Sequence, residues 1–276
     1  MQIEYRNDTK LLAVIGDPIG HSLSPLLQNT MLRKLGLNYL YLACPVAPGG
    51  LPQWLAAVKT MGIAGFNATM PHKLDLIPLL DVLTPAAKRN GAVNTVQRDG
   101  DRLIGHNTDG IGFARSLQDA GCGFSGAHVT VLGAGGAASA IVRQALDDGA
   151  SSVTIRNRSL ERAQLLCSDA PGKMRAIPAT EPLPGDTDLL INTLPIGAVW
   201  EKDLLAPLHS DCAVFDILYV PEVTPLMSLA RERRMHAVNG LGMLIYQAIY
   251  ALQFFVGEPI DDTAMGRLLY ETVKNR

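Results

Sequence analysis

The chain has 276 residues, of which 47% are hydrophobic and 18% charged, a composition typical of a globular protein long enough for two domains. The formal net charge of −2 argues against a general nucleic-acid partner or an anionic membrane as its target. Four scattered cysteines without paired spacing indicate neither a disulfide framework nor a zinc site, and we expect no metal. Because the charged start MQIEYRNDTK lacks the apolar segment of a secretion signal, we expect a cytoplasmic protein.

The first hundred residues are predicted to form an α/β domain. Apolar runs predict strands at residues 11–15, 39–43 and 63–67, and helices at 25–35 and 51–61. Ser24 stands before Pro25 as the expected N-cap of the first helix. Pro71 permits another helix that starts at His72. An Asp-Gly-Asp turn between the runs 92–98 and 102–106 predicts a hairpin, and a helix is expected over 110–120.

A βαβ unit over residues 129–158 organises the second domain. A β-branched strand at 129–132 leads into Gly133, Gly135 and Ala138, which occupy the G-x-G-x-x-G/A positions, and an amphipathic helix follows. This context predicts a turn that holds the pyrophosphate of a dinucleotide. The residues expected there are Gly133, Ala134, Gly135, Gly136 and Ala137. The alternative is an ordinary strand–turn–helix whose glycines serve only the turn.

The end of the next strand indicates NADP as the cofactor. An NAD site usually places an Asp or Glu about 20 residues after the first glycine to hold the ribose 2′-hydroxyl. This chain has Arg156, Asn157, Arg158 and Ser159 there, with Arg162 one turn into the following helix. Guanidinium groups match a 2′-phosphate in charge and geometry. The alternative is a solvated basic helix start, which would oppose the helix dipole.

The remaining elements complete two domains. Strands near 174–177, 188–192 and 213–216, with helices to about 167 and over 224–234, predict a doubly wound sheet. The apolar segment from Leu241 is too short to span a membrane, and we expect it to pack back on the first domain. The predicted fold class is therefore α/β, with an N-terminal α/β substrate domain (1–108 and 240–276) and a C-terminal Rossmann-like, doubly wound NADP domain (109–239).

Polar side chains gather where the strands of the first domain end. They are Ser22, Ser24, Asn67, Thr69, Lys73, Asn94 and Asp109. Each one by itself is more often a helix cap, a turn former or a solvated surface group. Because ligands bind at the carboxyl ends of strands in open α/β sheets, the set together favours a site for a small polyhydroxylated acid.

Eight motifs, in order and spacing, resemble the shikimate dehydrogenase family across about residues 10–260. They are GDPIGHSLSP (16–25), FNATMPHK (66–73), GAVNTV (91–96), GHNTDGIGF (105–113), GAGGAA (133–138), NRS (157–159), INTLPIG (191–197) and NGLGMLIYQA (239–248). A generic dinucleotide fold would share only the GAGGAA region.

The resemblance implies reversible NADP-dependent reduction of 3-dehydroshikimate to shikimate, in the route to chorismate and the aromatic amino acids, by a monomer or homodimer. It implies Lys73 and Asp109 as the catalytic pair, with Ser22 and Ser24 on the substrate carboxylate. Other expected substrate contacts are Asn67, Thr69, Asn94, Tyr219 and Gln247, and the nicotinamide side is expected to be lined by Thr193, Ile217 and Gly240. Alternatively, the pair is a structural ion pair, and the Gln247 amide bonds backbone.

Four positions depart from the family pattern. The family usually has Met at Ala198, His at Gln28, often Val at Ala68 and commonly Trp at Phe255. These departures leave open a paralogue that acts on quinate or an amino-substituted ring acid. Two more distant alternatives are a catalytically silent NADP-binding module and reduction of an unrelated small ketone. Both catalytic candidates are present, which argues against the silent module.

Overall fold

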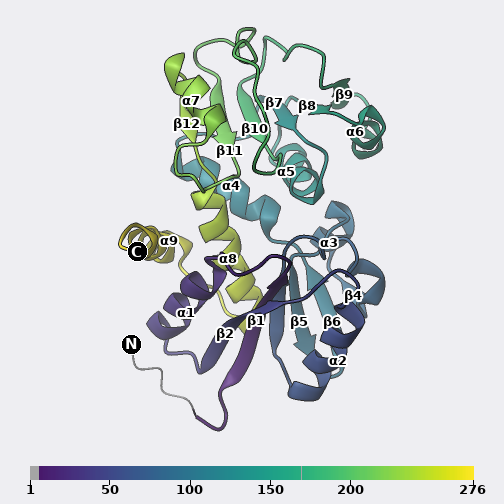
Figure 1. Ribbon diagram of the computed structural model, residues 1–276, viewed down its shortest axis with the longest axis vertical. Helices are drawn as coiled ribbons and strands as arrows, with labels where there is room; N and C mark the ends of the chain where they lie inside the picture. The colour runs from purple at the N-terminus through teal and green to yellow at the C-terminus, as the bar shows by residue number, and fades with distance from the viewer. Residues whose placement is uncertain (1–5, 169) are drawn as a thin grey trace. The chain divides into compact units, whose positions relative to one another are not determined.

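The computed structural model describes residues 6–168 and 170–276, and the chain divides into two compact units (Figure 1). One unit comprises Met1–Thr108 and Ile245–Arg276, and the other comprises Asp109–Leu244. The second division falls inside helix α8 (Leu241–Val256), a few residues after the boundary predicted from the sequence. Its physical basis is Met243, in the first turn of α8, which is buried in the core of the second unit.

The first unit contains a mixed six-stranded sheet in the order β2-β1-β3-β5-β6-β4. Its strands are β1 (Lys10–Gly16), β2 (Tyr39–Pro45), β3 (Gly65–Ala68), β4 (Val82–Leu83), β5 (Thr95–Asp99) and β6 (Arg102–His106). β1 runs parallel to β2 and β3, whereas β5 is antiparallel to β3 and forms the predicted hairpin with β6. Asn67 pairs with Thr95, so the end of β3 and the start of β5 meet at one edge.

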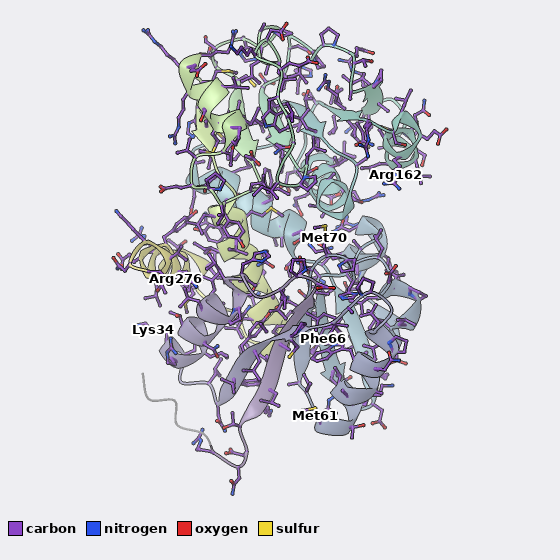
Figure 2. All side chains as sticks on the ribbon, viewed as in Figure 1. Lys34, Met61, Phe66, Met70, Arg162 and Arg276 are labelled. Atoms are coloured by element: carbon purple, nitrogen blue, oxygen red, sulfur yellow. The ribbon has the colours of Figure 1, made fainter. Side chains whose placement is uncertain are left out.

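Helices α1 (Ser24–Lys34), α2 (Leu51–Met61), α3 (Pro85–Asn90) and α9 (Asp262–Lys274), with most of α8, complete the first unit. Phe66, labelled in Figure 2, is fully buried in its core, where Trp54 packs edge-on against it. Gly65 is required because a Cβ there would lie 2.7 Å from the ring of Phe255. The absence of a side chain therefore lets β3 pass directly against α8, which returns to this unit as predicted.

Two local predictions in the first unit are wrong. No helix begins at His72; residues 70–76 form consecutive turns that lead into the 3-10 helix Ile77–Leu79. The reason is Pro78, which has no N–H to continue an α-helix from His72. Ser24 is the first helical residue and not the N-cap, because the cap position is Leu23; the Ser24 N–H donates to Ser22 Oγ at 3.2 Å.

The second unit contains a parallel six-stranded sheet in the order β12-β11-β10-β7-β8-β9. Its strands are β7 (His128–Leu132), β8 (Ser152–Asn157), β9 (Met174–Pro178), β10 (Leu189–Asn192), β11 (Ala213–Asp216) and β12 (Ala237–Val238). From β7 the chain adds strands outward on one side and then returns to add β10 on the other. This reversal is the topological switch point of a doubly wound fold, so the predicted fold class is confirmed.

Helices α4 (Asp109–Asp119), α5 (Gly136–Asp147), α6 (Leu160–Cys167) and α7 (Pro225–Glu232) belong to the second unit. Two apolar clusters build its core, one around Val131, Ile141 and Ile155, the other around Leu190 and Val214. Gly110 allows close packing of α4 on α5, since a Cβ there would lie 2.7 Å from the Ala140 carbonyl oxygen. Across the described residues, every helix is too short or too polar to cross a bilayer.

Candidate active site

Loops after β1 and β3 form the polar edge of the first unit. Thr69 follows β3, and its N–H donates to the Ile15 carbonyl at 2.9 Å. Gly16 leaves room for this approach, because a Cβ there would collide with the methyl group of Thr69. The carbonyl of Lys73 accepts the Val93 N–H at 2.8 Å, which fixes the backbone at Lys73 to the entrance of β5. The half-buried Lys73 is therefore held at this edge by the turns around it.

A buried network of amides and hydroxyls lies beneath that edge. Asn67 is 8% exposed; its two amide N–H groups donate to the Asn94 carbonyl and to Thr95 Oγ1, both at 3.0 Å. The Tyr41 hydroxyl donates to Asn67 Oδ1 at 2.6 Å. Asn94 Oδ1 accepts the Thr108 N–H at 2.9 Å, and Asn94 Nδ2 donates to Thr108 Oγ1 at 3.0 Å. The amide of Asn67 thus retains only one lone pair on Oδ1 beyond these bonds.

Tyr41 is a member of this network that sequence reasoning missed. Its side chain is 1% exposed, and burial is the main cause that raises its pKa well above the ordinary value of 10.0. The hydroxyl therefore stays protonated and acts as the donor to Asn67. Within the run YLYLA only the strand alternation could have placed Tyr41 inward, and the pattern carries no information about which buried group it meets.

Helix α8 is tied to this edge at two places. Thr108 Oγ1 donates to the Gln247 carbonyl at 3.1 Å. Gln28, which is 1% exposed on α1, donates from Nε2 to the Ala248 carbonyl at 2.9 Å. Its Oε1 has no hydrogen-bond partner among the described residues. Gln28, a departure from the family pattern, thus joins the helix that follows Ser22 to the helix that carries Gln247.

Asp109 is the first residue of α4 and is 4% exposed. A carboxylate at this position is favoured by the positive end of the helix dipole. It follows directly on Thr108, which the Asn94 network holds in place. Thus Lys73 and Asp109 are each held by ordered backbone, Lys73 in the first unit and Asp109 at the start of the second.

The glycine turn after β7 has the geometry of an anion site. Gly133 has φ +110, and a Cβ there would lie 2.5 Å from Thr193 Oγ1, so only glycine fits. Gly135 caps α5 in an extended conformation, and in the described structure no side chain accepts the first N–H groups of the helix. Those N–H groups, from Gly136 and Ala137 onward, suit a phosphate at the positive end of the helix dipole.

The predicted arginine cluster separates into two kinds of residue. Arg158 and Arg162 are exposed, and Figure 2 labels Arg162 on α6. Arg156 is half-buried and donates to the carbonyls of Ala179 and Glu181. Asn157 Nδ2 donates to the Ser159 carbonyl at 2.8 Å, and Ser159 Oγ caps α6 through the Arg162 N–H at 3.4 Å. Asn157 and Ser159 therefore shape the turn that presents Arg158 and Arg162.

Asp216 organises the loops after β10 and β11, although sequence reasoning did not place it in the site. Its carboxylate accepts Asn192 Nδ2 at 2.8 Å, the Leu218 N–H at 3.1 Å and the Thr224 hydroxyl at 2.7 Å. Beside it, Gly240 touches the Ile217 carbonyl so closely that no Cβ fits. The only available indication was that an acid ends an otherwise apolar strand.

The three residues expected on the nicotinamide side, with Tyr219, lie on or beside these loops. The hydroxyl of half-buried Thr193 donates to the Leu132 carbonyl at 2.8 Å. Ile217 is also half-buried, and the Gly240 N–H donates to the Leu218 carbonyl at 2.9 Å. Burial raises the pKa of the Tyr219 hydroxyl, so this group remains a donor at neutral pH.

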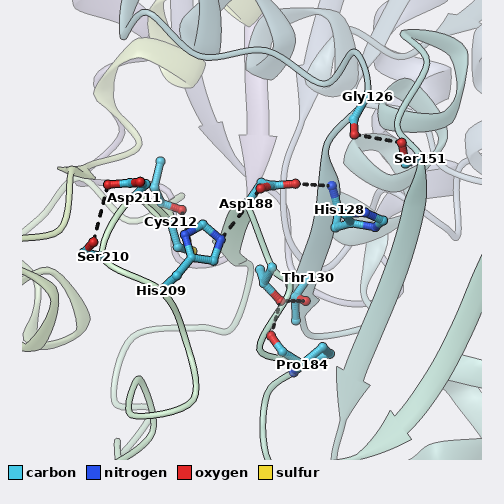
Figure 3. A network of polar contacts seen from close by, with 12 residues as sticks. Gly126, His128, Thr130, Ser151, Pro184, Asp188, His209, Ser210, Asp211 and Cys212 are labelled. Atoms are coloured by element: carbon cyan, nitrogen blue, oxygen red, sulfur yellow. Dashed lines mark hydrogen bonds and ion pairs between the residues drawn. The ribbon is translucent and has the colours of Figure 1, made fainter.

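A second polar cluster lies at the amino ends of β7 and β10 (Figure 3). Asp188 accepts the His128 N–H at 2.7 Å and lies 3.7 Å from His209 Nε2. Burial raises the pKa of nearby Cys212 to about 12, which keeps it a neutral thiol. Ligands bind at the carboxyl ends of the strands in such sheets, so this cluster lies at the edge opposite the expected ligand site. No group of three or more possible metal-ligating His, Cys, Asp or Glu side chains occurs in the described portion of the chain.

Two family models match the chain. The model described as the shikimate dehydrogenase substrate binding domain matches residues 14–96, which include the polar edge of the first unit. The model described as shikimate/quinate 5-dehydrogenase matches residues 115–192, which include the glycine turn and the arginines.

Individual relatives cover nearly the whole chain. The NADP(+) shikimate dehydrogenase of Geobacter metallireducens is 42% identical over 92% of this chain and 94% of its own length. A shikimate 5-dehydrogenase from Thermus thermophilus, solved in complex with NADP(H) and shikimate, is 31% identical, covers 95% of this chain and 99% of its own, and superposes with a TM-score of 0.85. A ligand-free 5-ketofructose reductase of Gluconobacter sp. strain CHM43 is 29% identical, with a TM-score of 0.84 and coverage of 98% and 99%.

Proposed function

Because the chain belongs to the shikimate dehydrogenase family, we propose that it catalyses the reversible NADPH-dependent reduction of 3-dehydroshikimate to shikimate, in the pathway to chorismate and the aromatic amino acids. The proposal depends on one observation. The chain combines the polar edge of the first unit with the glycine turn of the second unit, in the same order along the sequence as a relative that covers 92% of this chain. We assign residues 1–108 and 240–276 to the substrate domain and 109–239 to the NADP domain.

Lys73 and Asp109 perform the proton chemistry. NADPH, when bound, supplies the hydride that reduces the ketone. The oxygen of that ketone becomes an alkoxide, which needs a nearby positive charge and a proton. The Lys73 ammonium provides both, and the Asp109 carboxylate orients it and stabilises its charged form. In the reverse direction Lys73 accepts the proton from the substrate hydroxyl.

The substrate is held by its carboxylate and its ring hydroxyls. Ser22 Oγ already accepts the Ser24 N–H, which leaves its own O–H to donate to a carboxylate oxygen. Ser24 supplies a second hydroxyl beside it. The remaining lone pair of Asn67 Oδ1 accepts a ring hydroxyl. The other substrate contacts in this proposal are Thr69, Asn94, Tyr219 and Gln247.

The residues present fit NADP. The turn of Gly133, Ala134, Gly135, Gly136 and Ala137 holds the pyrophosphate, because its glycines admit close approach and its helix N-terminus has unused N–H groups. Arg158 and Arg162 hold the 2′-phosphate from the turn that Asn157 and Ser159 shape. Thr193, Ile217 and Gly240 line the nicotinamide side.

We place the enzyme in the cytoplasm as a monomer or homodimer. Size-exclusion chromatography with light scattering would distinguish the two oligomeric states.

Initial rates measured by nicotinamide absorbance test the function. Shikimate and quinate are each combined with NADP and NAD at saturating cofactor, and we expect shikimate with NADP to exceed every other pair by more than about tenfold in kcat/KM. A preference for quinate would support the quinate-type alternative. Binding of NADPH without turnover would support a silent module. Because one structural relative is a 5-ketofructose reductase, 5-ketofructose with NADPH is the fifth assay.

A further inference from the structure

Arg156 differs from the other arginines of the cofactor edge in what its guanidinium contacts. Its Nε donates to the Glu181 carbonyl at 2.9 Å, and its terminal nitrogen donates to the Ala179 carbonyl. Burial is the main influence on its pKa and lowers it, while the opposing charge of Glu201 raises it. By contrast, Arg158 and Arg162 are exposed, and neither guanidinium has a partner among the residues the structure describes. One arginine is therefore engaged within the protein and two are available to a ligand.

The two bonds of Arg156 attach the turn 178–181 to strand β8. This turn follows β9 and is closed by the Glu181 N–H, which donates to the Pro178 carbonyl at 3.1 Å. In the sheet, Arg156 pairs with Ile177 and Asn157 pairs with Pro178, so the turn begins beside Arg156. A planar guanidinium reaches two carbonyls at once, whereas a lysine ammonium lacks that fixed fork.

The turn 178–181 belongs to the adenosine half of the sheet. In a doubly wound nucleotide fold, each three-stranded half binds one mononucleotide, and the half that begins with the glycine turn binds adenosine. Here that half is β7, β8 and β9. The pyrophosphate turn follows β7 and the ribose-binding turn follows β8, so the turn after β9 continues the same carboxyl edge. The turn 178–181 therefore borders the adenosine of a dinucleotide whose pyrophosphate is bound at the glycine turn.

We propose that Arg156 is a positioning residue for dinucleotide binding: it holds the turn 178–181 as a wall beside the adenosine and does not bind the 2′-phosphate. The inference rests on the proposed function only for the identity of the cofactor. Its consequence is specific. Loss of the Arg156 hydrogen bonds weakens the binding of NADPH and NADH to the same degree, whereas loss of Arg158 selectively weakens the binding of NADPH.

The test measures the Kd of NADPH and of NADH by isothermal titration calorimetry on the full chain, with kcat measured at saturating cofactor. For Arg156→Met we expect both Kd values to rise by a similar factor, about tenfold, with kcat within about twofold of the parent. Arg156→Lys keeps the positive charge but not the planar guanidinium that reaches two carbonyls, so it should still bind both NADPH and NADH more weakly than the parent. Arg175→Met is the matched control, because Arg175 lies on β9 and bonds the Thr154 hydroxyl at 2.9 Å, away from the turn.

Three results would overturn the proposal. If Arg156→Met weakens the binding of NADPH alone, Arg156 contacts the 2′-phosphate. If both Kd values are unchanged, the turn 178–181 is not part of the binding site. If Arg156→Lys binds both dinucleotides as tightly as the parent, the charge of Arg156 and not its two hydrogen bonds is what matters. If Arg156→Met does not fold, hydrogen exchange of the parent chain decides. NADPH added without shikimate should protect the backbone amides of residues 179–181, and no protection contradicts the inference. The two Kd values and the hydrogen exchange do not depend on turnover, so NADPH binding without shikimate turnover would defeat the proposed function and leave this inference standing.

Discussion

The two units use their polar groups in different ways at the edges where we propose that ligands bind. In the first unit, side-chain amides and hydroxyls are buried and hydrogen-bonded to one another and to backbone carbonyls, as in the Asn67–Asn94–Thr108 network. In the second unit, the part of the edge that follows β7 and β8 consists of main-chain N–H groups at a glycine turn and of the exposed Arg158 and Arg162. The first edge is a fixed arrangement of side chains, whereas the part of the second edge after β7 and β8 is a backbone turn with exposed cations beside it.

This difference matches what each edge has to distinguish. A small ring acid is recognised by the positions of its hydroxyls, and a buried, hydrogen-bonded network can hold one pattern of donors and acceptors rigidly. A pyrophosphate is common to all dinucleotides, so a helix N-terminus suffices for it, and in the proposed site only the arginines would select the 2′-phosphate. Substitutions in the first unit should therefore change turnover or stability, whereas those in the second should change cofactor affinity.

Lys73→Ala should have the largest effect. We expect turnover of shikimate with NADP to fall by about 10³- to 10⁴-fold, because the alkoxide loses its proton donor, while the Kd of shikimate changes only a few-fold. Steady-state rates and calorimetric titration measure the two quantities. Lys88→Ala, at an exposed lysine of α3, is the control. Turnover within tenfold of the parent would remove Lys73 from the mechanism.

Asn94→Leu tests whether the first edge is a structural network. The substitution removes both the donor to Thr108 Oγ1 and the acceptor of the Thr108 N–H, and leaves buried polar groups without partners. We expect the free energy of unfolding in urea to fall by about 2–4 kcal/mol. Gln53→Leu, at an exposed amide of α2, should change it by less than about 0.5 kcal/mol. Similar losses in the two variants would contradict a network that stabilises the fold.

Arg158→Met tests the exposed cations of the second edge. We expect the Kd of NADPH to rise by about 10- to 100-fold and that of NADH by less than about threefold, because only NADPH carries the charged 2′-phosphate. Calorimetry at fixed ionic strength measures both. Arg231→Met, at an exposed arginine of α7, should leave both values unchanged. Equal weakening of the two dinucleotides would reject the 2′-phosphate assignment.

The smallest effect that we predict is a pH dependence of stability that arises from His106 in the first unit. Burial lowers its pKa below the ordinary 6.5, and the ring stacks on Phe254 with centroids 4.5 Å apart. As the pH falls below 6.5, the His106 ring takes up a proton in the unfolded chain before it does so in the folded chain. The stability that the folded protein has from the neutral ring is therefore fully present above pH 6.5 and is lost as the pH falls through the folded pKa. His106→Gln should therefore lose less stability than the parent between about pH 7.5 and about pH 5.5 in urea unfolding. The control is His21→Gln, at an exposed histidine; a slope unchanged in His106→Gln would show that His106 does not titrate there.

Local patterns were sufficient for most of the elements and for the cofactor class. The glycine spacing, the helix after it, Arg156 and Arg158 are all contained in thirty consecutive residues, so residues 129–158 predict a dinucleotide unit without tertiary information. The short strands β4 and β12 were missed, because two residues carry no periodicity. The wrong helix at His72 has a local cause too, since Pro78 was present in the sequence and its effect was overlooked.

By itself, the sequence determined the α/β class, the doubly wound order of the second unit and the set of residues from which a site can be built. Only the tertiary structure decided how those residues are used. Asn67 meets Tyr41 across 26 positions of the chain, and Arg156 meets Glu181 across 25. The physical reason is that a hydrogen bond depends on where two atoms lie after strands far apart in sequence have paired. Three neighbouring arginines look alike in the sequence, and their different partners appear only once the turn after β9 is folded against one of them.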